Sequence, residues 1–228
     1  MKKLILLFLI FLVISFVLNN TFISNARNNI DNDMSNILVK ERLIKLEKEV
    51  YLKDLIQYIE FESEIIIPEY FDVKYVEYTH SLADTLKIPI RTAFRLIYKE
   101  SCFRDTVVSG KGAKGLMQLM PNTRKMYYEL LCVDTLNLDK NQEDIYIGMN
   151  YLKNLYDFWI SRGNSQKYSW KLSLASYNAG EGTVLDNNGI PPIKETTDFI
   201  AFILKTHSNP EFFANYVKKY ENEIKDGT

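Results

Sequence analysis

Glu100 is the residue of this chain best placed to act as a general acid. Three residues at helical spacing before it, Ala93, Leu96 and Ile97, are apolar, so the pattern places a carboxylate on a helix face that should be buried. Burial raises the pKa of a carboxyl group, which can then keep the proton needed to protonate a glycosidic oxygen near neutral pH. The alternative is a helix-terminal glutamate that faces solvent or bonds to the backbone.

Other chemistries find less support in the sequence. The glycine-rich stretch SGKGAKG (109–115) lacks the Lys-Ser/Thr pair of a phosphate-binding loop, so its glycines indicate flexibility or close approach of the backbone to a ligand. The two histidines, His80 and His207, lie far apart and outside any zinc-binding motif, so we expect no metal and no cofactor. Cys102 paired with either histidine would give a nucleophile for a wall-peptide hydrolase, which is an alternative that spacing leaves open.

Three short motifs occur in order along the chain: ESCF (100–103), SGKGAKGLMQLMPNT (109–123) and LASYNAG (174–180). As an ordered set they resemble the catalytic domain of soluble-type lytic transglycosylases, over roughly residues 72–206. The resemblance implies a mostly α, lysozyme-like fold. It also implies that the substrate is the glycan strand of bacterial peptidoglycan.

The resemblance also implies roles for individual residues. Glu100 matches the single catalytic acid of the family, and Ser101 matches a hydrogen-bond partner that supports it. Tyr177 and Asn178 match a pair beside the acid that orients it and holds an N-acetyl group. The other implied substrate-binding residues are Met117 and Gln118, in a segment that lines the sugar groove, and Glu195, in the closing motif ETTDFI.

Each of these residues also has a purely structural interpretation. Tyr177 would pack in a core with its hydroxyl bonded, Met117 would fill a gap in the core, and Asn178 would cap a helix end. The chain departs from the family pattern at two positions: Asp144 stands where asparagine is usual, and Phe199 stands where a tyrosine hydroxyl usually lies near the acid.

A single carboxylate determines the expected mechanism. Ordinary glycosidases use two carboxylates, whereas the nearest acid in sequence, Asp105, lies about 140° around an ideal helix from Glu100. The resemblance implies that Glu100 acts first as acid and then as base, and that the muramic acid's own hydroxyl attacks to form an anhydro ring. Two alternatives are a lysozyme-like muramidase that uses water and a non-catalytic glycan-binding or assembly factor of an envelope-spanning machine.

The sequence predicts that the elements positioning these residues are helices. Helical periodicity predicts the following helices: 33–60, 75–86, one that begins at KIPI (87–90) and carries Glu100, 144–160, 170–178 and 196–206. The first of them is amphipathic, and residues before Pro68 break its pattern. No segment alternates as a strand would, so the sequence predicts a mostly α protein.

The N-terminus predicts export. Lys2 and Lys3 precede an apolar run (4–18), and small residues follow at Ser24 and Ala26, as in a secretory signal; an uncleaved membrane anchor is the alternative. We therefore expect a location in the bacterial periplasm or cell envelope. The predicted organisation is a signal or anchor (1–26), a helical segment and connector (27–71), the catalytic domain (72–206) and a C-terminal helical tail (207–228).

Charge and cysteine content limit the partners. Without residues 1–26 the chain would hold 26 basic and 29 acidic side chains, and such a balance gives no electrostatic basis for binding nucleic acid. The expected partner is peptidoglycan, with a secretion, conjugation or flagellar apparatus as a further partner and the membrane only through an uncleaved N-terminus. Cys102 and Cys132 predict either a disulfide or two buried thiols.

Overall fold

The computed structural model describes residues 37–205, together with Phe212 and Tyr216. The chain divides into two compact units, residues 1–58 and 59–228, and the described residues of each are treated separately. The predicted signal or anchor at 1–26 lies outside the described residues, and so does all of the predicted tail except Phe212 and Tyr216. None of the described helices is both long and apolar enough to cross a membrane.

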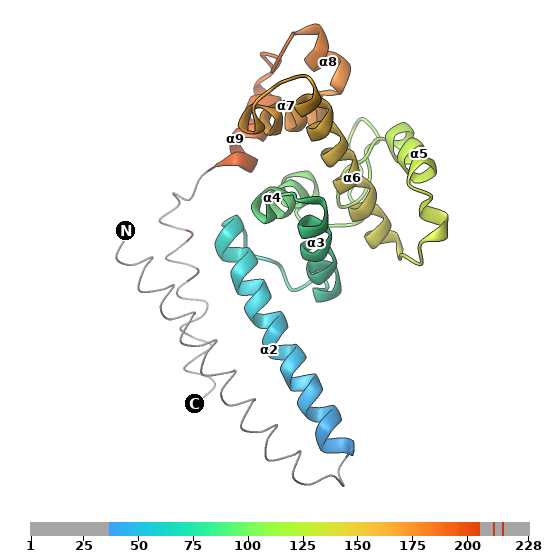
Figure 1. Cartoon of the computed structure of the whole chain (residues 1–228), viewed down its shortest axis with the longest axis vertical. Helices are drawn as coiled ribbons and strands as arrows, with labels where there is room; N and C mark the ends of the chain where they lie inside the picture. Colours follow the sequence, from blue (N-terminus) through green and yellow to red (C-terminus); the bar gives the residue numbers. More distant parts are fainter. Residues whose placement is uncertain (1–36, 206–211, 213–215, 217–228) are drawn as a thin grey trace. The chain divides into compact units, whose positions relative to one another are not determined.

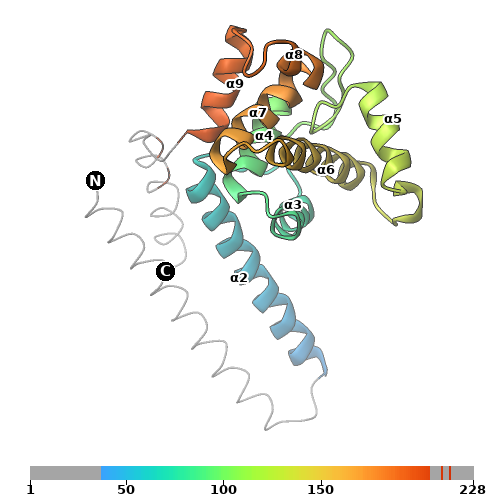
Figure 2. The ribbon, with the colours of Figure 1, turned by 45° about the horizontal axis from the view of Figure 1, so that its top comes forward.

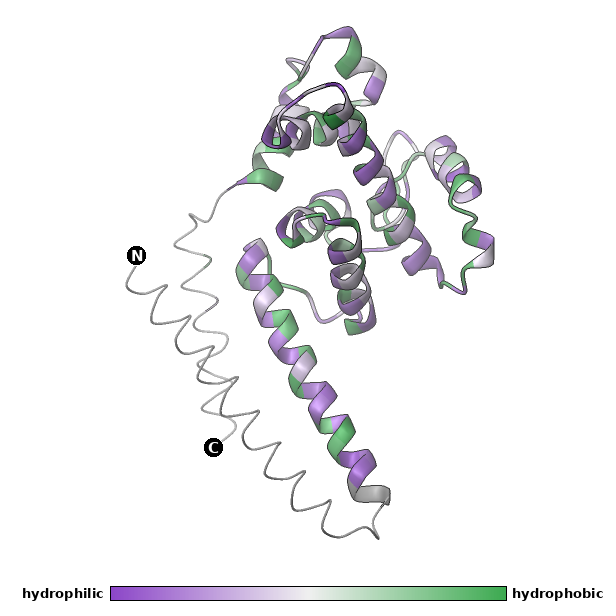
Figure 3. Cartoon of the chain, in the orientation of Figure 1, coloured by the Kyte–Doolittle hydropathy of each residue, from purple (hydrophilic) through white to green (hydrophobic). Residues whose placement is uncertain are grey.

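The described chain is built from helices (Figure 1), as the sequence predicted, and within these residues the only β pairing is two isolated bridges, Val108 with Lys114 and Lys114 with Leu119. The helices are α2 (Ile37–Ser63), α3 (Val73–Leu86), α4 (Ile90–Ser101), α5 (Pro121–Leu130), the 3-10 turn η1 (Val133–Thr135), α6 (Lys140–Ser161), α7 (Gln166–Ala179), α8 (Glu181–Asp186) and α9 (Lys194–Leu204). Hydrophobic and hydrophilic residues are interspersed along α2 (Figure 3).

Capping residues explain why several helices begin earlier than their apolar periodicity predicts. The side chain of Asp72 accepts a hydrogen bond from the amide of Lys74 at the start of α3. Asp139 and Gln142 form a reciprocal capping box at the start of α6, and Ser165 accepts from the amide of Tyr168 in α7. These polar first turns carry no apolar stripe, so periodicity alone does not include them.

The sequence interpretation missed α5 and α8. Pro121 is the first residue of α5, where its missing N–H costs nothing. Only one residue of α5, Tyr127, is buried, so this helix has little of the apolar stripe that would have revealed it.

The second unit is organised around α7. This helix packs against α6, α8 and α9, while α4 packs against α3 and α9, and α3 also contacts α6. In Figures 1 and 2, α5 lies at the edge of this unit beside α6. Fully buried side chains from α4, α6 and α7, among them Leu96, Ile145 and Leu174, form the core between these helices.

The second unit begins at Ile59, before the predicted domain start at residue 72. The connector contributes buried side chains, including Ile65, Ile67 and Phe71. The buried carboxylate of Glu60 accepts a hydrogen bond from the amide of Ile67 at 2.8 Å. The residues just before α3 and α4 are therefore part of the unit that holds these helices.

The cysteines form neither a disulfide nor a pair of buried thiols, the two alternatives that the sequence predicted. Cys102 and Cys132 are free, so the structure contains no disulfide between them, and both are exposed rather than buried. Both have a left-handed backbone next to a helix end: Cys102 follows α4, and Cys132 precedes η1.

Candidate active site

Glu100 lies in the last turn of α4 and is half-buried. Burial raises the pKa of its carboxyl group from 4.5 to about 8; the charge of Lys99 opposes this rise and that of Glu195 adds to it. Among the residues that the structure describes, neither oxygen of Glu100 has a hydrogen-bond or ion-pair partner. The carboxyl group is therefore protonated near neutral pH and available to bind a substrate oxygen.

The chain turns sharply after Glu100. Cys102 and Phe103 both adopt a left-handed backbone, with φ of 49° and 63°, which is unfavourable for residues other than glycine. The ring of Phe103 is buried and holds this turn, with ring centroids 4.8 Å from Phe71 and 6.4 Å from Phe94. The hydroxyl of Tyr70 donates a hydrogen bond to the carbonyl of Cys102 at 2.7 Å.

Tyr70→Phe should reduce cleavage without unfolding the protein. The substitution removes only the hydroxyl that holds the Cys102 carbonyl, and an exposed neutral hydrogen bond contributes about 1 kcal/mol. We expect a several-fold loss in kcat with KM little changed, because the turn positions the acid and does not touch the glycan. Steady-state kinetics of Tyr70→Phe and of Tyr168→Phe, at a second exposed tyrosine, would measure this; equal kinetics for both variants would contradict a positioning role.

The segment after the glycine-rich loop is fixed by its own side chain and by α6. Gln118 has a left-handed backbone, and its side-chain amide donates to the carbonyls of Val107 and Gly115 at 3.0 and 2.9 Å. Gly115 has φ of 82°, and a Cβ there would collide with the carboxylate of Asp144. The amide nitrogen of Gln118 therefore holds the loop, while its amide oxygen accepts no hydrogen bond from the described residues.

Met117 takes part through its backbone. Its amide donates to Asp144 at 3.2 Å, and its carbonyl accepts a hydrogen bond from the Tyr177 hydroxyl at 2.8 Å. Its side chain is fully buried and touches Gly148 so closely that a Cβ at Gly148 would clash with it. The side chain of Met117 is thus packed in the core, where a sugar cannot reach it.

The buried Asp144 and the partly exposed Arg124 form an ion pair that the sequence did not reveal. Asp144 is 3% exposed, and Arg124 from α5 forms an ion pair with it. Burial raises the pKa of Asp144, while Arg124 and the amides of Met117 and Leu116 lower it. The carboxylate at the position where asparagine was expected therefore has a cation to compensate it, and together they fix the segment that ends at Met117.

Tyr177 and Asn178, at the end of α7, each bond to a different segment of the chain. Burial raises the pKa of Tyr177 well above 10, and the charge of Glu100 raises it further, which shows that the two side chains are close. The amide oxygen of Asn178 accepts a hydrogen bond from the hydroxyl of Thr196 in α9 at 2.8 Å. This bond leaves the NH2 group of Asn178 to donate elsewhere.

The remaining predicted residues lie at the two ends of the site. The hydroxyl of Ser101 donates to the carbonyl of Ile97 at 3.1 Å, one turn back in α4, and makes no bond to Glu100. Glu195 is exposed in the first turn of α9, near enough for its charge to raise the pKa of Glu100. Phe199, on the same helix, is 2% exposed.

The structure therefore brings several of the predicted residues into one connected site. Glu100, Tyr177 and Glu195 interact electrostatically, and Tyr177 is bonded to the segment that carries Gln118. Residues that motif matching missed include Tyr70, Arg124 and Thr196. Of these three residues only Thr196 lies inside a quoted motif, ETTDFI, next to Glu195. For Tyr70 and Arg124 the sequence carries no signal.

Comparison with known proteins identifies similar chains. Residues 77–200 match the family model described as the transglycosylase SLT domain. The X-ray structure of an inactive mutant of the lytic transglycosylase Slt from Pseudomonas aeruginosa aligns with a TM-score of 0.45 and 22% sequence identity. That alignment covers 66% of this chain and 25% of the other, so this chain spans about a quarter of the protein that it matches.

Proposed function

Because the chain belongs to the transglycosylase SLT domain family, we propose that it is a lytic transglycosylase that cleaves the glycan strand of bacterial peptidoglycan. The bond cleaved joins N-acetylmuramic acid to N-acetylglucosamine. The observation that carries the proposal is Glu100: it is half-buried at the end of α4, has no hydrogen-bond or ion-pair partner among the described residues and interacts electrostatically with Tyr177. A carboxyl group held only for structure would be bonded to its surroundings.

The reaction proceeds in two proton transfers. Protonated Glu100 gives its proton to the glycosidic oxygen, so the bond from that oxygen to the muramic acid breaks and positive charge develops on the ring. The resulting carboxylate then takes the proton of the muramic acid's own hydroxyl as this oxygen attacks the cationic carbon. The products are an anhydro-muramic acid end and a free N-acetylglucosamine hydroxyl, and Glu100 is again protonated.

The other site residues position the acid and the sugar. The NH2 group of Asn178, whose amide oxygen is held by Thr196, donates to the N-acetyl carbonyl of the substrate. The amide oxygen of Gln118 accepts from a sugar hydroxyl, because its nitrogen is occupied by the loop. The hydrogen bond from the Tyr177 hydroxyl to the Met117 carbonyl holds the segment of Gln118 against α7. Ser101 stabilises the end of the helix that carries Glu100 through its bond to the Ile97 carbonyl.

One observation favours a muramidase as the second candidate. Glu195 is a carboxylate whose charge acts on Glu100, so it offers a base that could activate a water molecule. The two candidates differ in product, since water gives a reducing muramic acid end. A non-catalytic glycan-binding role, within an envelope-spanning machine, would leave both products absent.

Digestion of purified peptidoglycan should release muropeptides that end in anhydro-muramic acid. An intramolecular hydroxyl has a large effective molarity and outcompetes water when the site holds it near the cation. Mass spectrometry separates the two products by the mass of one water. Reducing ends alone would replace this proposal with the muramidase, and intact glycan after prolonged digestion would support the binding role.

We place this activity in the cell envelope, where peptidoglycan lies. The predicted signal or anchor at 1–26 supports export, and helix α2 (Ile37–Ser63) leads into the unit that holds the site. A secretion, conjugation or flagellar apparatus would be served by local opening of the wall.

A further inference from the structure

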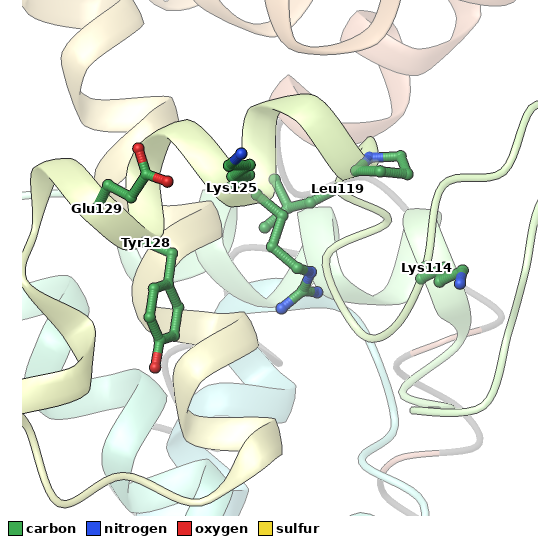
Figure 4. Close-up of a pocket in the computed structure, with 7 residues that line it drawn as sticks. Lys114, Leu119, Lys125, Tyr128 and Glu129 are labelled. Carbon is green, nitrogen blue, oxygen red and sulfur yellow. The ribbon is translucent and has the colours of Figure 1, made fainter.

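A cavity lies between α5 and the loop that precedes it. It has a volume of about 360 Å³ and is separate from Glu100. Its lining includes Lys114 and Leu119 from the loop and Pro121, Arg124, Lys125 and Tyr128 from α5. Figure 4 shows Lys114 on the loop and Lys125 and Tyr128 on the helix. We call it the α5 pocket.

The α5 pocket is cationic. Lys114, Arg124 and Lys125 line it against a single carboxylate, Glu129. Arg124 is paired with the buried Asp144, but within the described part of the chain Lys114 and Lys125 have no ion-pair partner. An anion that enters the pocket is therefore attracted by lysines from both of its walls, the loop and α5.

The rest of the lining is hydrocarbon. Leu119, Pro121 and the ring of Tyr128 offer apolar surface between the cations. A bare inorganic anion would leave this surface exposed to water, whereas an aliphatic chain that ends in a carboxylate would cover it and meet the lysines. The pocket therefore fits an amino-acid-like carboxylate.

We propose that the α5 pocket binds a carboxylate of the peptide stem that muramic acid carries. This inference rests on the proposed function, because it takes the stem to be part of the same substrate. Pocket and active site share one set of contacts: Arg124 pairs with Asp144, Asp144 binds the amide of Met117, and the carbonyl of Met117 binds Tyr177 beside Glu100. A stem held in the pocket is thus tied to the segment that lines the acid.

Calorimetric titration of the full chain with a free stem tetrapeptide tests the pocket without any cleavage. We expect binding to weaken about tenfold when the peptide's carboxylates are amidated, and about tenfold in the double variant Lys114→Gln/Lys125→Gln. Added salt should weaken the parent's binding in the same direction. The control double variant Lys140→Gln/Lys167→Gln removes two exposed lysines elsewhere on the surface and should bind like the parent.

The outcomes separate this proposal from the proposed function. No binding of the tetrapeptide, equal binding of its amidated form, or equal losses in both double variants would overturn the pocket, whatever the protein cleaves. Cleavage of glycan strands stripped of their peptides tests the function alone. The pocket further predicts that the parent's kcat/KM is higher on stem-bearing than on stripped glycan, and that this ratio falls in Lys114→Gln/Lys125→Gln.

Discussion

Glu100→Gln is expected to abolish cleavage of peptidoglycan while the protein stays folded. Glutamine keeps the shape of the protonated acid but has no proton to transfer, and general acid–base catalysis supplies roughly 10²–10⁴-fold. Because Glu100 serves as acid in the first step and base in the second, we expect the upper end of that range. Release of soluble muropeptides measures the loss.

The same variant should be more stable than the parent near pH 7. The pKa of Glu100 is about 8 when folded and 4.5 when exposed, so between these values unfolding lets the group release its proton and favours the unfolded parent. The parent therefore has its full stability below about pH 4.5 and loses stability as pH rises through about 8. Glutamine does not titrate. The advantage of Glu100→Gln should be of the order of 2–3 kcal/mol at pH 7, somewhat reduced because the side chain keeps partial contact with water.

Chemical denaturation at pH 4, 7 and 9 would measure the difference in free energy of unfolding between Glu100→Gln and the parent. We expect this difference to be small at pH 4, to be present at pH 7 and to be largest at pH 9. Asp186→Asn removes an exposed carboxyl group from α8 and serves as the matched control, with unchanged cleavage and no such pH trend. A Glu100→Gln protein that still releases muropeptides would remove Glu100 from the mechanism. A variant that loses stability at pH 7 would show that the carboxylate makes structural bonds.

The sequence predicts those helices of this protein that carry a periodic apolar stripe. The stripe Ala93, Leu96, Ile97 and Glu100 predicted the helix and the half-buried acid, because apolar spacing and burial have the same cause. Helix α5 was not predicted because it buries only one side chain and so has no apolar stripe. The first turns of α3, α6 and α7 were not predicted because they are set by polar capping residues, which hydrophobic periodicity does not detect.

Hydrophobic periodicity does not predict which residues from distant segments contact each other. Nothing in the sequence links Tyr70 to Cys102, or Arg124 to Asp144, since each pair meets only when several helices have packed. The motif set indicated that Met117, Gln118 and Tyr177 belong together, but it could not show that Met117 acts through its carbonyl and Gln118 through a loop. Motifs record which residues matter, whereas the bonding partner of each atom is set by the tertiary fold.

Arg95 is the clearest case of a residue without any sequence signal. It lies in α4, with its side chain 3% exposed, and its guanidinium donates hydrogen bonds to the carbonyls of Ser63, Phe202 and Lys205. These carbonyls lie at the C-terminal ends of α2 and α9, where helices leave acceptors unsatisfied. Glu64, whose side chain is 4% exposed, forms an ion pair with it at 3.3 Å. One cation thus joins two helix ends to the helix that carries Glu100.

Arg95→Met is therefore expected to destabilise the protein by about 3–5 kcal/mol, the usual loss when one partner of a buried pair is removed. Methionine fills much of the volume but satisfies none of the three carbonyls, and it removes the cation that pairs with the Glu64 carboxylate. Arg104→Met, at an exposed arginine just beyond the same helix, should change the free energy of unfolding by less than about 0.5 kcal/mol. Denaturant titration of both variants would measure the difference. If Arg95→Met unfolded at the same denaturant concentration as Arg104→Met, the two helix ends would be held by apolar packing alone.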